Sequence, residues 1–429
     1  MMTLKKSLSV FFLSTFIEKG IAFLIIPLLT AKIAPAGIGK LSLITSIYAF
    51  LTPLILLNTG GAIYVEHFRN DNKAHYKRYF STALFINFLA FIFFSLIAFL
   101  GMNYFAAIIN CPPYWIMALP LFCFFDAIKM SVLNVLQIQK KPLYFSLVSL
   151  SASILNLTLS LLFVYRFGLD YMGRLSGIFI SSLVIAAFAF FLFLKFDLIT
   201  KKVSKIFAKD ILNYGLPLLP HAFGYLVLDV SDRFFIRHFS GEAALGIYSI
   251  SYLVSSVVFI LASVFNTSWT PFLYDELKNN NRVGDLKIVK ITWKFIFAML
   301  LFCLVYLLFI PLLYRLFINE QYYPGIKYCL PIVTGYFFMT VYLAFANVIF
   351  YYKKNHIFGL VAIINISLNL VLNYFLVKLY GPYGAAIATC ISMFLFMATI
   401  AFYSNRVRSL PWAEGFRLFV ADVKKGKFI

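Results

Sequence analysis

Residues 295–314 read FIFAMLLFCLVYLLFIPLLY, an unbroken apolar and aromatic stretch that contains no charged residue. A helix that crosses the hydrocarbon core of a bilayer needs about 20 such residues in succession. The strands of a membrane barrel would alternate apolar with polar residues, and this stretch does not. It therefore predicts one membrane-spanning α-helix.

Comparable stretches recur along the whole chain. Hydrophobic residues make up 62% of it and charged residues 12%, whereas a soluble domain has about 25% charged residues. The start shows no short apolar stretch followed by a small-residue cleavage site, so we expect no removable signal peptide. The predicted fold class is an all-α integral membrane protein of about twelve transmembrane helices. The predicted spans lie near 11–33, 41–64, 80–103, 113–137, 142–166, 172–195, 211–237, 245–273, 291–316, 327–352, 356–379 and 383–404.

The formal net charge is +21, and the basic residues gather in every second loop. About 25 of them lie in one set of loops and about 8, with Arg174 among them, lie in the other set. Cytoplasmic loops carry such an excess, so we expect both termini in the cytoplasm. Most of the charge then serves topology and contact with anionic membrane lipid. No soluble domain displays it, which argues against a nucleic-acid partner.

An internal repeat divides the chain into two halves. Residues of the first half return in the second at an offset of 213, which shortens to 211 after the last loop; the matched sets are Asn134-Val135, Lys140-Lys141, Leu155-Asn156, Gly168 and Gly173, and Asn347-Val348, Lys353-Lys354, Leu368-Asn369, Gly381 and Gly384. An even number of spans in each half gives both the same orientation, as in transporters with a substrate site between two parallel repeats. We therefore predict a six-helix lobe at 1–195, a linker at 196–212, a second six-helix lobe at 213–405 and a basic cytoplasmic tail at 406–429.

The linker is too polar to span a membrane. Its lysines take one helical face, and the other face carries Ile199, Val203, Ile206, Phe207 and Ile211. This pattern predicts an amphipathic helix on the cytoplasmic membrane surface. The tail has a similar but less regular pattern, with Trp412, Phe416, Phe419 and Val420 near basic residues.

Ionisable residues inside the spans are candidate functional residues, because each costs about 2.5–3.5 kcal/mol at a helix centre. The cations that could bind an anionic substrate are Lys19, Lys129 and Arg233. The candidates to bind a coupling ion, either H⁺ or Na⁺, are Glu18, Asp126, Asp229, Asp232 and His221.

Structural roles are the alternative for most of these residues. Asp126 and Lys129 are three residues apart and can form a pair that locks two helices together. Asp232 and Arg233 could be solvated near the outer interface, and His221 could be a hydrogen-bonded packing residue. Glu18 and Lys19 are neighbours that point about 100° apart, so at least one should face a cavity or another helix.

The first and seventh predicted spans carry Pro27, Pro217 and Pro220 at equivalent places in the two halves. Proline in a spanning helix frees backbone carbonyls and bends the axis, which suits either a gate or simply a curved bundle. The five cysteines are scattered without metal-ligand spacing. No phosphate loop or other enzyme motif is present, so we predict no catalytic residue, no metal site and no cofactor.

Several motifs resemble those of one family. The stretch Tyr214-Gly215-Leu216-Pro217 with Pro220-His221, Asp232-Arg233 and Leu245-Gly246-Ile247-Tyr248-Ser249 resembles the start of the second half of the Wzx-type polysaccharide flippases. Leu368-Asn369 followed by Gly381-Pro382-Tyr383-Gly384 is likewise similar. These flippases belong to the multidrug/oligosaccharidyl-lipid/polysaccharide exporter superfamily, and the resemblance covers nearly the whole chain.

The resemblance implies a V-shaped pair of six-helix lobes that exposes a central cavity to each side of the membrane in turn. The implied cargo is a repeat unit on undecaprenyl diphosphate, of the O-antigen or capsule type, as in lipopolysaccharide biosynthesis. It would move from the cytoplasmic to the periplasmic leaflet of the bacterial inner membrane, with an ion gradient as the expected driving force. A polysaccharide polymerase and a ligase would be candidate partners. The family's cavity charges correspond loosely to Lys19, Lys129 and Arg233.

Three rival functions remain. A multidrug/cation antiporter of the same superfamily would prefer an acidic cavity, whereas acids and bases nearly balance inside these spans. A lipid II flippase resembles a longer chain with about two extra helices. A membrane scaffold or a polysaccharide polymerase is the third, but a polymerase should carry a large outer loop, and the longest here has about ten residues.

Overall fold

The computed structural model describes residues 17–18, 20–21, 24–69, 72–139, 141–279, 281–352, 354 and 356–424. All regular structure in these ranges is helical, which confirms the predicted all-α fold class. The chain forms two compact units, 1–226 and 227–429. The division falls inside the helix that joins them, whereas the sequence placed the second lobe's start at residue 213.

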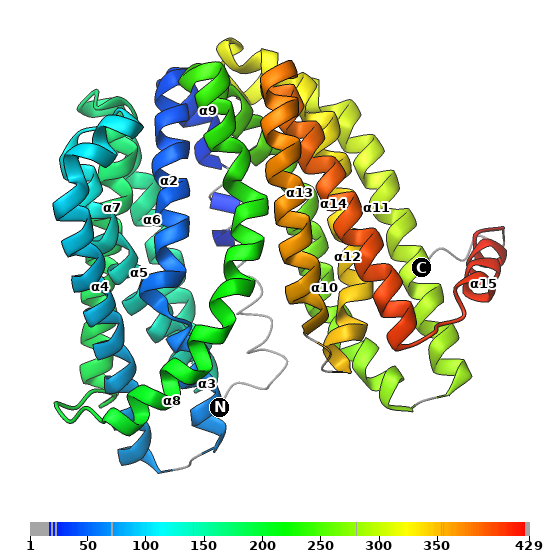
Figure 1. Cartoon of the computed structure of the whole chain (residues 1–429), viewed down its shortest axis with the longest axis horizontal. Coiled ribbons are helices and arrows are strands. Elements are labelled where there is room, and N and C mark those ends of the chain that lie inside the picture. The colour runs from blue at the N-terminus through cyan, green and yellow to red at the C-terminus, as the bar shows by residue number, and fades with distance from the viewer. Residues whose placement is uncertain are drawn as a thin grey trace. The chain divides into compact units, whose positions relative to one another are not determined.

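The first unit is a bundle of long helices (Figure 1). Its elements are α2 (Pro35–Leu56), α3 (Thr59–Arg69), α4 (Lys73–Ile109), α5 (Pro113–Ile138), α6 (Pro142–Leu161) with the π-turn η1 (Leu162–Arg166), α7 (Asp170–Lys195), α8 (Lys205–Gly215), the 3₁₀ turn η2 (Leu216–Leu218) and the start of α9 (Leu219–Ser255). Its core packs buried residues of α3, α4, α5 and α7 together, among them Ile63, Phe80, Val135 and Phe193.

The second unit is built in the same way (Figure 1). It holds the rest of α9, α10 (Val257–Asn279), α11 (Arg282–Phe317), η3 (Glu320–Gly325), α12 (Ile326–Tyr351), α13 (His356–Tyr380), α14 (Pro382–Val407) and α15 (Trp412–Lys424). Within the described ranges, ten helical stretches are long and apolar enough to cross a membrane. Of the first predicted span, 11–33, residues 11–16, 19, 22 and 23 lie outside those ranges.

One helix break differs from the predicted spans, and a second, at Gly241, falls in the loop predicted between spans 211–237 and 245–273. The span predicted at 41–64 ends at Leu56, because Leu57 and Asn58 adopt left-handed backbone conformations with φ of 46° and 50°. Asn87 of α4 donates hydrogen bonds to the freed carbonyls of Ile55 (2.7 Å) and Leu56 (3.0 Å). These bonds satisfy the backbone carbonyls that the end of the helix leaves without an intrahelical partner.

The second break lies in α9. The chain leaves helical geometry at Gly241, with φ 85° and ψ 176°, a region open to glycine. Pro217 lies in the turn η2 and Pro220 is the second residue of α9, so both stand where α8 gives way to α9, and their role in a gate or a curved bundle stays a prediction. In the first turn of a helix the missing N–H of proline leaves no bond unmade. Pro27 lies within the helical residues 24–30.

The repeat includes a short amphipathic helix after the last span of each half. Lys205-Ile206-Phe207-Ala208-Lys209-Asp210-Ile211 in α8 matches Arg417-Leu418-Phe419-Val420-Ala421-Asp422-Val423 in α15 at an offset of 212. The helix α8 packs on α3 and α4, and α15 packs on α11. The helices α4 and α11 are themselves equivalent, since each begins after a capping asparagine, Asn72 or Asn281.

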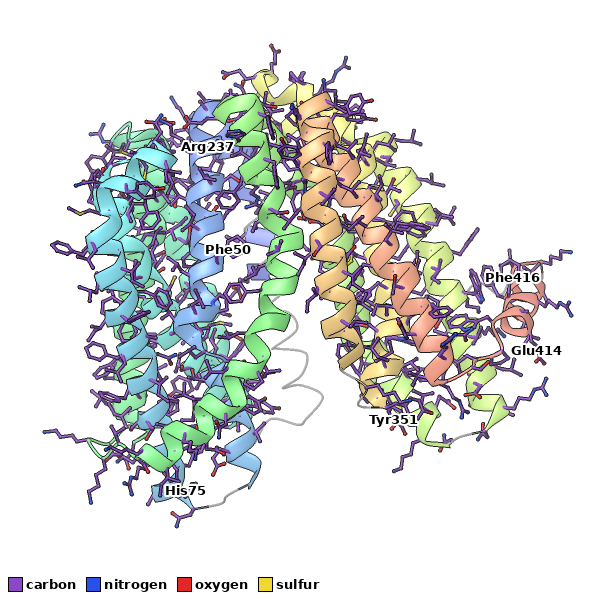
Figure 2. The ribbon with its side chains drawn as sticks, in the orientation of Figure 1. Phe50, His75, Arg237, Tyr351, Glu414 and Phe416 are labelled. Carbon is purple, nitrogen blue, oxygen red and sulfur yellow. The ribbon has the colours of Figure 1, made fainter. Side chains whose placement is uncertain are left out.

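The residues that the two helices share make equivalent contacts. The ring of Phe207 lies 4.6 Å from that of His75 on α4 (Figure 2), and the ring of Phe419 lies 5.6 Å from that of Phe297 on α11. Asp210 accepts a hydrogen bond from Tyr79 (2.7 Å), and Asp422 pairs with Lys290 (2.7 Å). Hydrogen bonds from lysine side chains hold the pKa of the Asp422 carboxyl below its usual range. Each helix is therefore an integral part of its half.

The amphipathic helix is shorter than predicted, because α8 begins at Lys205 and Ile199 and Val203 precede it. Within α8, Ile211 is buried and Phe207 packs on the core, and Ile206 is 79% exposed. Its counterpart Leu418 is also exposed. An exposed apolar side chain at the same place in both helices fits contact with lipid.

The basic loops of each half meet at one end of their unit. In the first unit, Lys77 pairs with Asp197, and the Lys141 ammonium lies 3.5 Å from the centre of the Phe196 ring. In the second unit, Arg408 pairs with Asp285 (2.8 Å) and Arg282 with Glu414 (2.8 Å). This arrangement agrees with the alternation of basic loops on which the predicted orientation rests.

The repeated glycines Gly173 and Gly384 allow close helix contact. A Cβ on Gly173 would lie 3.0 Å from the carbonyl carbon of Phe163, and one on Gly384 would collide with the carbonyl oxygen of Leu376, which is the equivalent residue at the 213 offset. The repeat therefore preserves one contact between successive helices.

We predict that Gly384→Ala lowers the free energy of unfolding by about 1–3 kcal/mol, because the added methyl group forces α13 and α14 apart. Thermal unfolding of the purified protein in detergent would measure this loss. Gly359→Ala is the matched control, since a Cβ on Gly359 meets nothing within 4 Å. Equal losses in the two variants would contradict the proposed contact.

Candidate functional site

The first unit holds one of the predicted charge pairs. The Lys129 ammonium lies 2.6 Å from the Asp126 carboxylate on the same helix, α5. Tyr48 of α2 donates a hydrogen bond to that carboxylate. The three side chains thus join α5 to α2, as the structural alternative for Asp126 and Lys129 predicted.

Four other candidates can be placed only in part. Glu18 is half-buried, and Lys19 lies outside the described residues. His221 and Asp229 belong to α9, but the described side chains do not include theirs. Their roles remain predictions from the sequence.

Asp232 lies in a buried polar site of the second unit. Its side chain is 1% exposed and accepts a hydrogen bond from the buried hydroxyl of Tyr248. Both residues lie on α9, on opposite sides of the break at Gly241, and Thr389 of α14 lies beside Tyr248. Solvation at an outer interface, the alternative for Asp232, is therefore wrong.

A row of asparagines completes this site. Asn365, Asn369 and Asn373 recur every four residues on α13, so they share a face, and each is at most 4% exposed. The oxygen of Asn369 accepts hydrogen bonds from Ser231 of α9 (2.8 Å) and from the Asn373 amide (3.0 Å). The Asn369 amide donates to Ser392 of α14 (2.9 Å). Three helices thus meet through polar side chains.

The site has acceptor capacity that the protein does not use. The side-chain oxygens of Asn365 and Asn373 and the Asn365 amide nitrogen are buried and have no hydrogen-bond partner among the described residues, whereas the Thr389 hydroxyl interacts with Tyr248. Buried polar atoms are nearly always satisfied, and an orphan calls for an explanation. A buried carboxylate on α9 and amide oxygens on the adjoining α13 are the kinds of group that hold a proton or a hard cation.

Arg233 follows Asp232 on α9. Its guanidinium lies 5.8 Å from the centre of the Tyr252 ring, and the side chain is half-buried. An arginine held over an aromatic ring keeps a fixed orientation and can still present donors to an oxyanion.

The corresponding place in the first unit carries its own cation. Arg174 donates hydrogen bonds to Asn156 and to Ser160 (2.7 Å). At the repeat offsets these residues correspond to Ala385, Asn369 and Asn373. The charge count grouped Arg174 with an outer loop, although the predicted span 172–195 contains it; α7 begins at Asp170 and carries Arg174 against α6. The first half satisfies its polar site with a guanidinium, and the second half has alanine there.

Sequence analysis missed most of this network. It found Asp232 by its charge and Leu368-Asn369 by the repeat, but not Ser231, Asn373, Thr389 or Ser392. The four-residue spacing of the asparagines in an apolar span was an available signal. The partners on α9 and α14 gave none, because lone hydroxyl residues are common in spanning helices.

A bundle of apolar helices with a buried polar site inside one unit is the architecture of a membrane transporter. Two protein-family models match this chain. The model described as polysaccharide biosynthesis protein covers residues 4–275, and the model described as MatE covers residues 217–375. The chain belongs to the polysaccharide biosynthesis protein family.

Two relatives come from Haemophilus influenzae. The Lsg locus putative protein 1 is 26% identical over 396 residues, which are 87% of this chain and 92% of the relative. An uncharacterized membrane protein is 24% identical over 367 residues, which are 82% and 85% of the two chains. The chain is a multi-pass membrane protein.

Solved structures share the fold. An inward-facing multidrug resistance MATE family transporter superimposes with a TM-score of 0.72 at 14% identity, over 91% of this chain and 94% of the other. The lipid II flippase MurJ gives 0.66 at 15% identity, over 96% and 90%. A superfamily transporter from Pyrococcus furiosus, described as having a binding pocket of reverse polarity, gives 0.65 at 17% identity, over 94% and 96%. The fold is that of exporter-superfamily transporters and flippases, which are not enzymes.

We predict that Asp126→Asn destabilises the protein by about 1–3 kcal/mol, because it leaves the Lys129 ammonium without its charged partner inside a span. Thermal unfolding in detergent would measure the loss. The double variant Asp126→Asn with Lys129→Gln should lose less than the sum of the two single variants. Additive losses would show that the pair is not coupled.

Proposed function

We propose that this protein moves an oligosaccharide repeat unit linked to undecaprenyl diphosphate from the cytoplasmic to the periplasmic leaflet of the bacterial inner membrane. The family match over residues 4–275 carries the proposal, and the fold shared with a lipid II flippase supports it. A cargo of the O-antigen or capsule type fits a protein of polysaccharide biosynthesis. Both termini would be cytoplasmic, and a polymerase and a ligase would act next on the cargo.

The diphosphate of such a cargo needs cationic contacts. Lys19 and Arg233 are the proposed contacts, with Lys129 as a third that would first have to leave Asp126. Arginine can hold a phosphate through two donors at once, and lysine acts as a point charge. The reverse polarity described for the Pyrococcus furiosus transporter is a precedent for pockets of different charge on this fold.

We further propose that the Asp232 site binds the coupling ion, either Na⁺ or H⁺. The buried carboxylate and the unused oxygens of Asn365 and Asn373 support this assignment. The contrast with Arg174 supports it as well, because a fixed guanidinium does in the first half what an exchangeable cation would do in the second.

A second function has a specific observation in its favour. The MatE model matches residues 217–375, and several solved neighbours are multidrug transporters. Antiport of cationic drugs would use the same fold and the same ion site, so only the cargo separates the two functions.

The cargo can be tested in a strain that lacks this gene. A flippase predicts that undecaprenyl-linked repeat units accumulate, that surface polysaccharide is lost, and that the gene restores both. Normal surface polysaccharide together with a gain in sensitivity to cationic dyes would favour the drug antiporter instead.

Lys19→Ala and Arg233→Ala should each reduce surface polysaccharide at least tenfold while the protein still inserts, because a charge-assisted contact to phosphate is worth about 1.5–3 kcal/mol. Arg315→Ala is the matched control, since Arg315 is exposed in the last turn of α11. Immunoblots of membranes would check insertion. Full export by both variants would refute the cationic contacts.

Sodium should raise the unfolding temperature of the purified protein by several degrees relative to choline, because an ion that binds only the folded state stabilises it by mass action. Asp232→Asn and Asn373→Leu should abolish the shift. Asn156→Ala, at the equivalent of Asn369 in the first half, should retain it. A shift with pH but not with sodium would identify the proton as the coupling ion, and an unchanged response in Asp232→Asn would exclude the site.

A further inference from the structure

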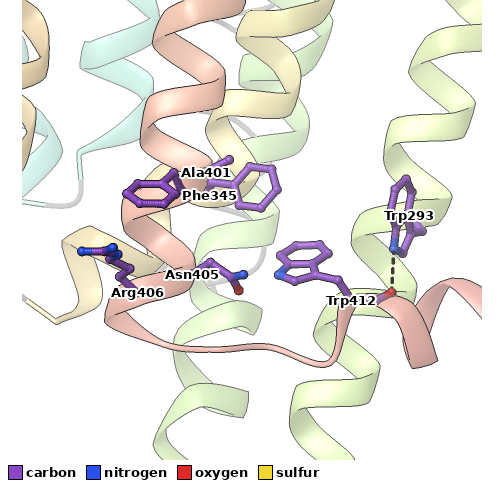
Figure 3. A pocket seen from close by; sticks show the side chains of 7 residues that line it. Trp293, Phe345, Ala401, Asn405, Arg406 and Trp412 are labelled. Atoms are coloured by element: carbon purple, nitrogen blue, oxygen red, sulfur yellow. Dashed lines mark hydrogen bonds between the residues drawn. The ribbon is translucent and has the colours of Figure 1, made fainter.

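A cavity lies within the second unit, at the end where its basic residues meet. It has a volume of about 450 Å³, which is within the range of ligand sites. Its walls are Trp293 of α11, Phe345 of α12, Phe402, Asn405 and Arg406 of α14, and Trp412 of α15 (Figure 3). No acidic residue lines it. Neither the ion site nor the proposed cargo contacts involve these residues.

Arg406 differs from the basic residues around it. Each of the others on α11 and after α14 that face α15 has a carboxylate partner: Arg282 pairs with Glu414, Lys287 with Glu276, Lys290 and Lys294 with Asp422, and Arg408 with Asp285. Arg406 pairs with no carboxylate in the described part of the chain. Its guanidinium lies 4.7 Å from the centre of the Phe402 ring, which orients it.

Two neutral donors accompany this cation. The Asn405 amide, turned towards the Trp412 ring in Figure 3, and the Trp412 indole N–H make no hydrogen bond to another described residue. The position of Trp412 is nevertheless fixed, because Trp293 donates to its backbone carbonyl (3.3 Å) and its ring lies 4.9 Å from that of Phe345. The cavity thus offers three kinds of donor and no acid.

This combination selects the ligand by its chemistry. A guanidinium, an amide and an indole N–H suit an anion with several acceptor oxygens, such as a phosphate. The aromatic walls suit an apolar body joined to that phosphate. Basic pockets at the ends of spanning helices bind anionic lipid head groups, and tryptophan is enriched at that depth. The adjoining helix α15 also exposes Phe416 and Leu418 (Figure 2).

We propose that this cavity binds the phosphate of an anionic membrane phospholipid, with Arg406, Asn405 and Trp412 as its donors. The lipid would supply the counter-charge that Arg406 lacks and would hold α15 to α14 from the membrane side. The site is independent of the transported cargo, because it depends on residues of the second unit alone.

Native mass spectrometry of the full-length protein in detergent, with dioleoyl phosphatidylglycerol or dioleoyl phosphatidylcholine added, tests the site. We expect one phosphatidylglycerol bound about tenfold more tightly than phosphatidylcholine. Arg406→Gln should remove that preference, and Asn405→Ala should weaken it. Arg417→Gln removes the same charge from the exposed side of α15 and should leave the preference unchanged.

Three outcomes would overturn the proposal. Equal losses in Arg406→Gln and Arg417→Gln would mean general attraction between lipid and the basic end. Inorganic phosphate that competes as well as phosphatidylglycerol would mean a small-anion site. Undecaprenyl phosphate that displaces phosphatidylglycerol at a tenfold lower concentration would assign the cavity to the cargo lipid.

Discussion

Inside the hydrocarbon of a bilayer no solvent accepts or donates a hydrogen bond, so each polar group must find its partner within the protein. Helical hydrogen bonds pair the backbone N–H and C=O groups. Many side-chain hydroxyl groups donate to the backbone carbonyl four residues earlier, as Thr30 does to Ile26 (3.0 Å) and Ser46 to Ser42 (2.8 Å). Where a helix must break, a side chain replaces the lost bond, and Asn87 does so for the end of α2. The fold is largely a set of solutions to this one constraint.

Under the same constraint, the side-chain oxygens of the second half that lack a partner call for an explanation. In the first half, Arg174 donates hydrogen bonds to Asn156 and Ser160, so the side-chain oxygens there already have a partner. In the second half, Asn369 is satisfied by neighbours, but the side-chain oxygens of Asn365 and Asn373 have no partner among the described residues. At equivalent positions of the repeat, the first half thus has a guanidinium, and the second half has side-chain oxygens without a partner among the described residues.

Continuous apolar stretches predicted the spanning helices well, because a helix needs such a stretch to cross lipid and few other structures use one. The stretch 113–137 became Pro113–Ile138, and 356–379 became His356–Tyr380. The pair Asp126–Lys129 was also predictable from its three-residue spacing. The break at Leu57 was not, because the apolar pattern continues through it and its partner Asn87 is thirty residues away. The partners of Arg174 were not predictable, because its surroundings depend on how α6 and α7 lie against each other. Lys19 lies outside the described residues, so its role remains a prediction.

The amphipathic helices α8 and α15 have a consequence for biosynthesis. Each is the last element of its half, and each docks on a helix of the same half through one phenylalanine and one aspartate. A ribosome that has just completed α8 has therefore already delivered the residues on which α8 docks. These contacts can form before the second half is translated, and the repeat holds each amphipathic helix together with its own docking residues.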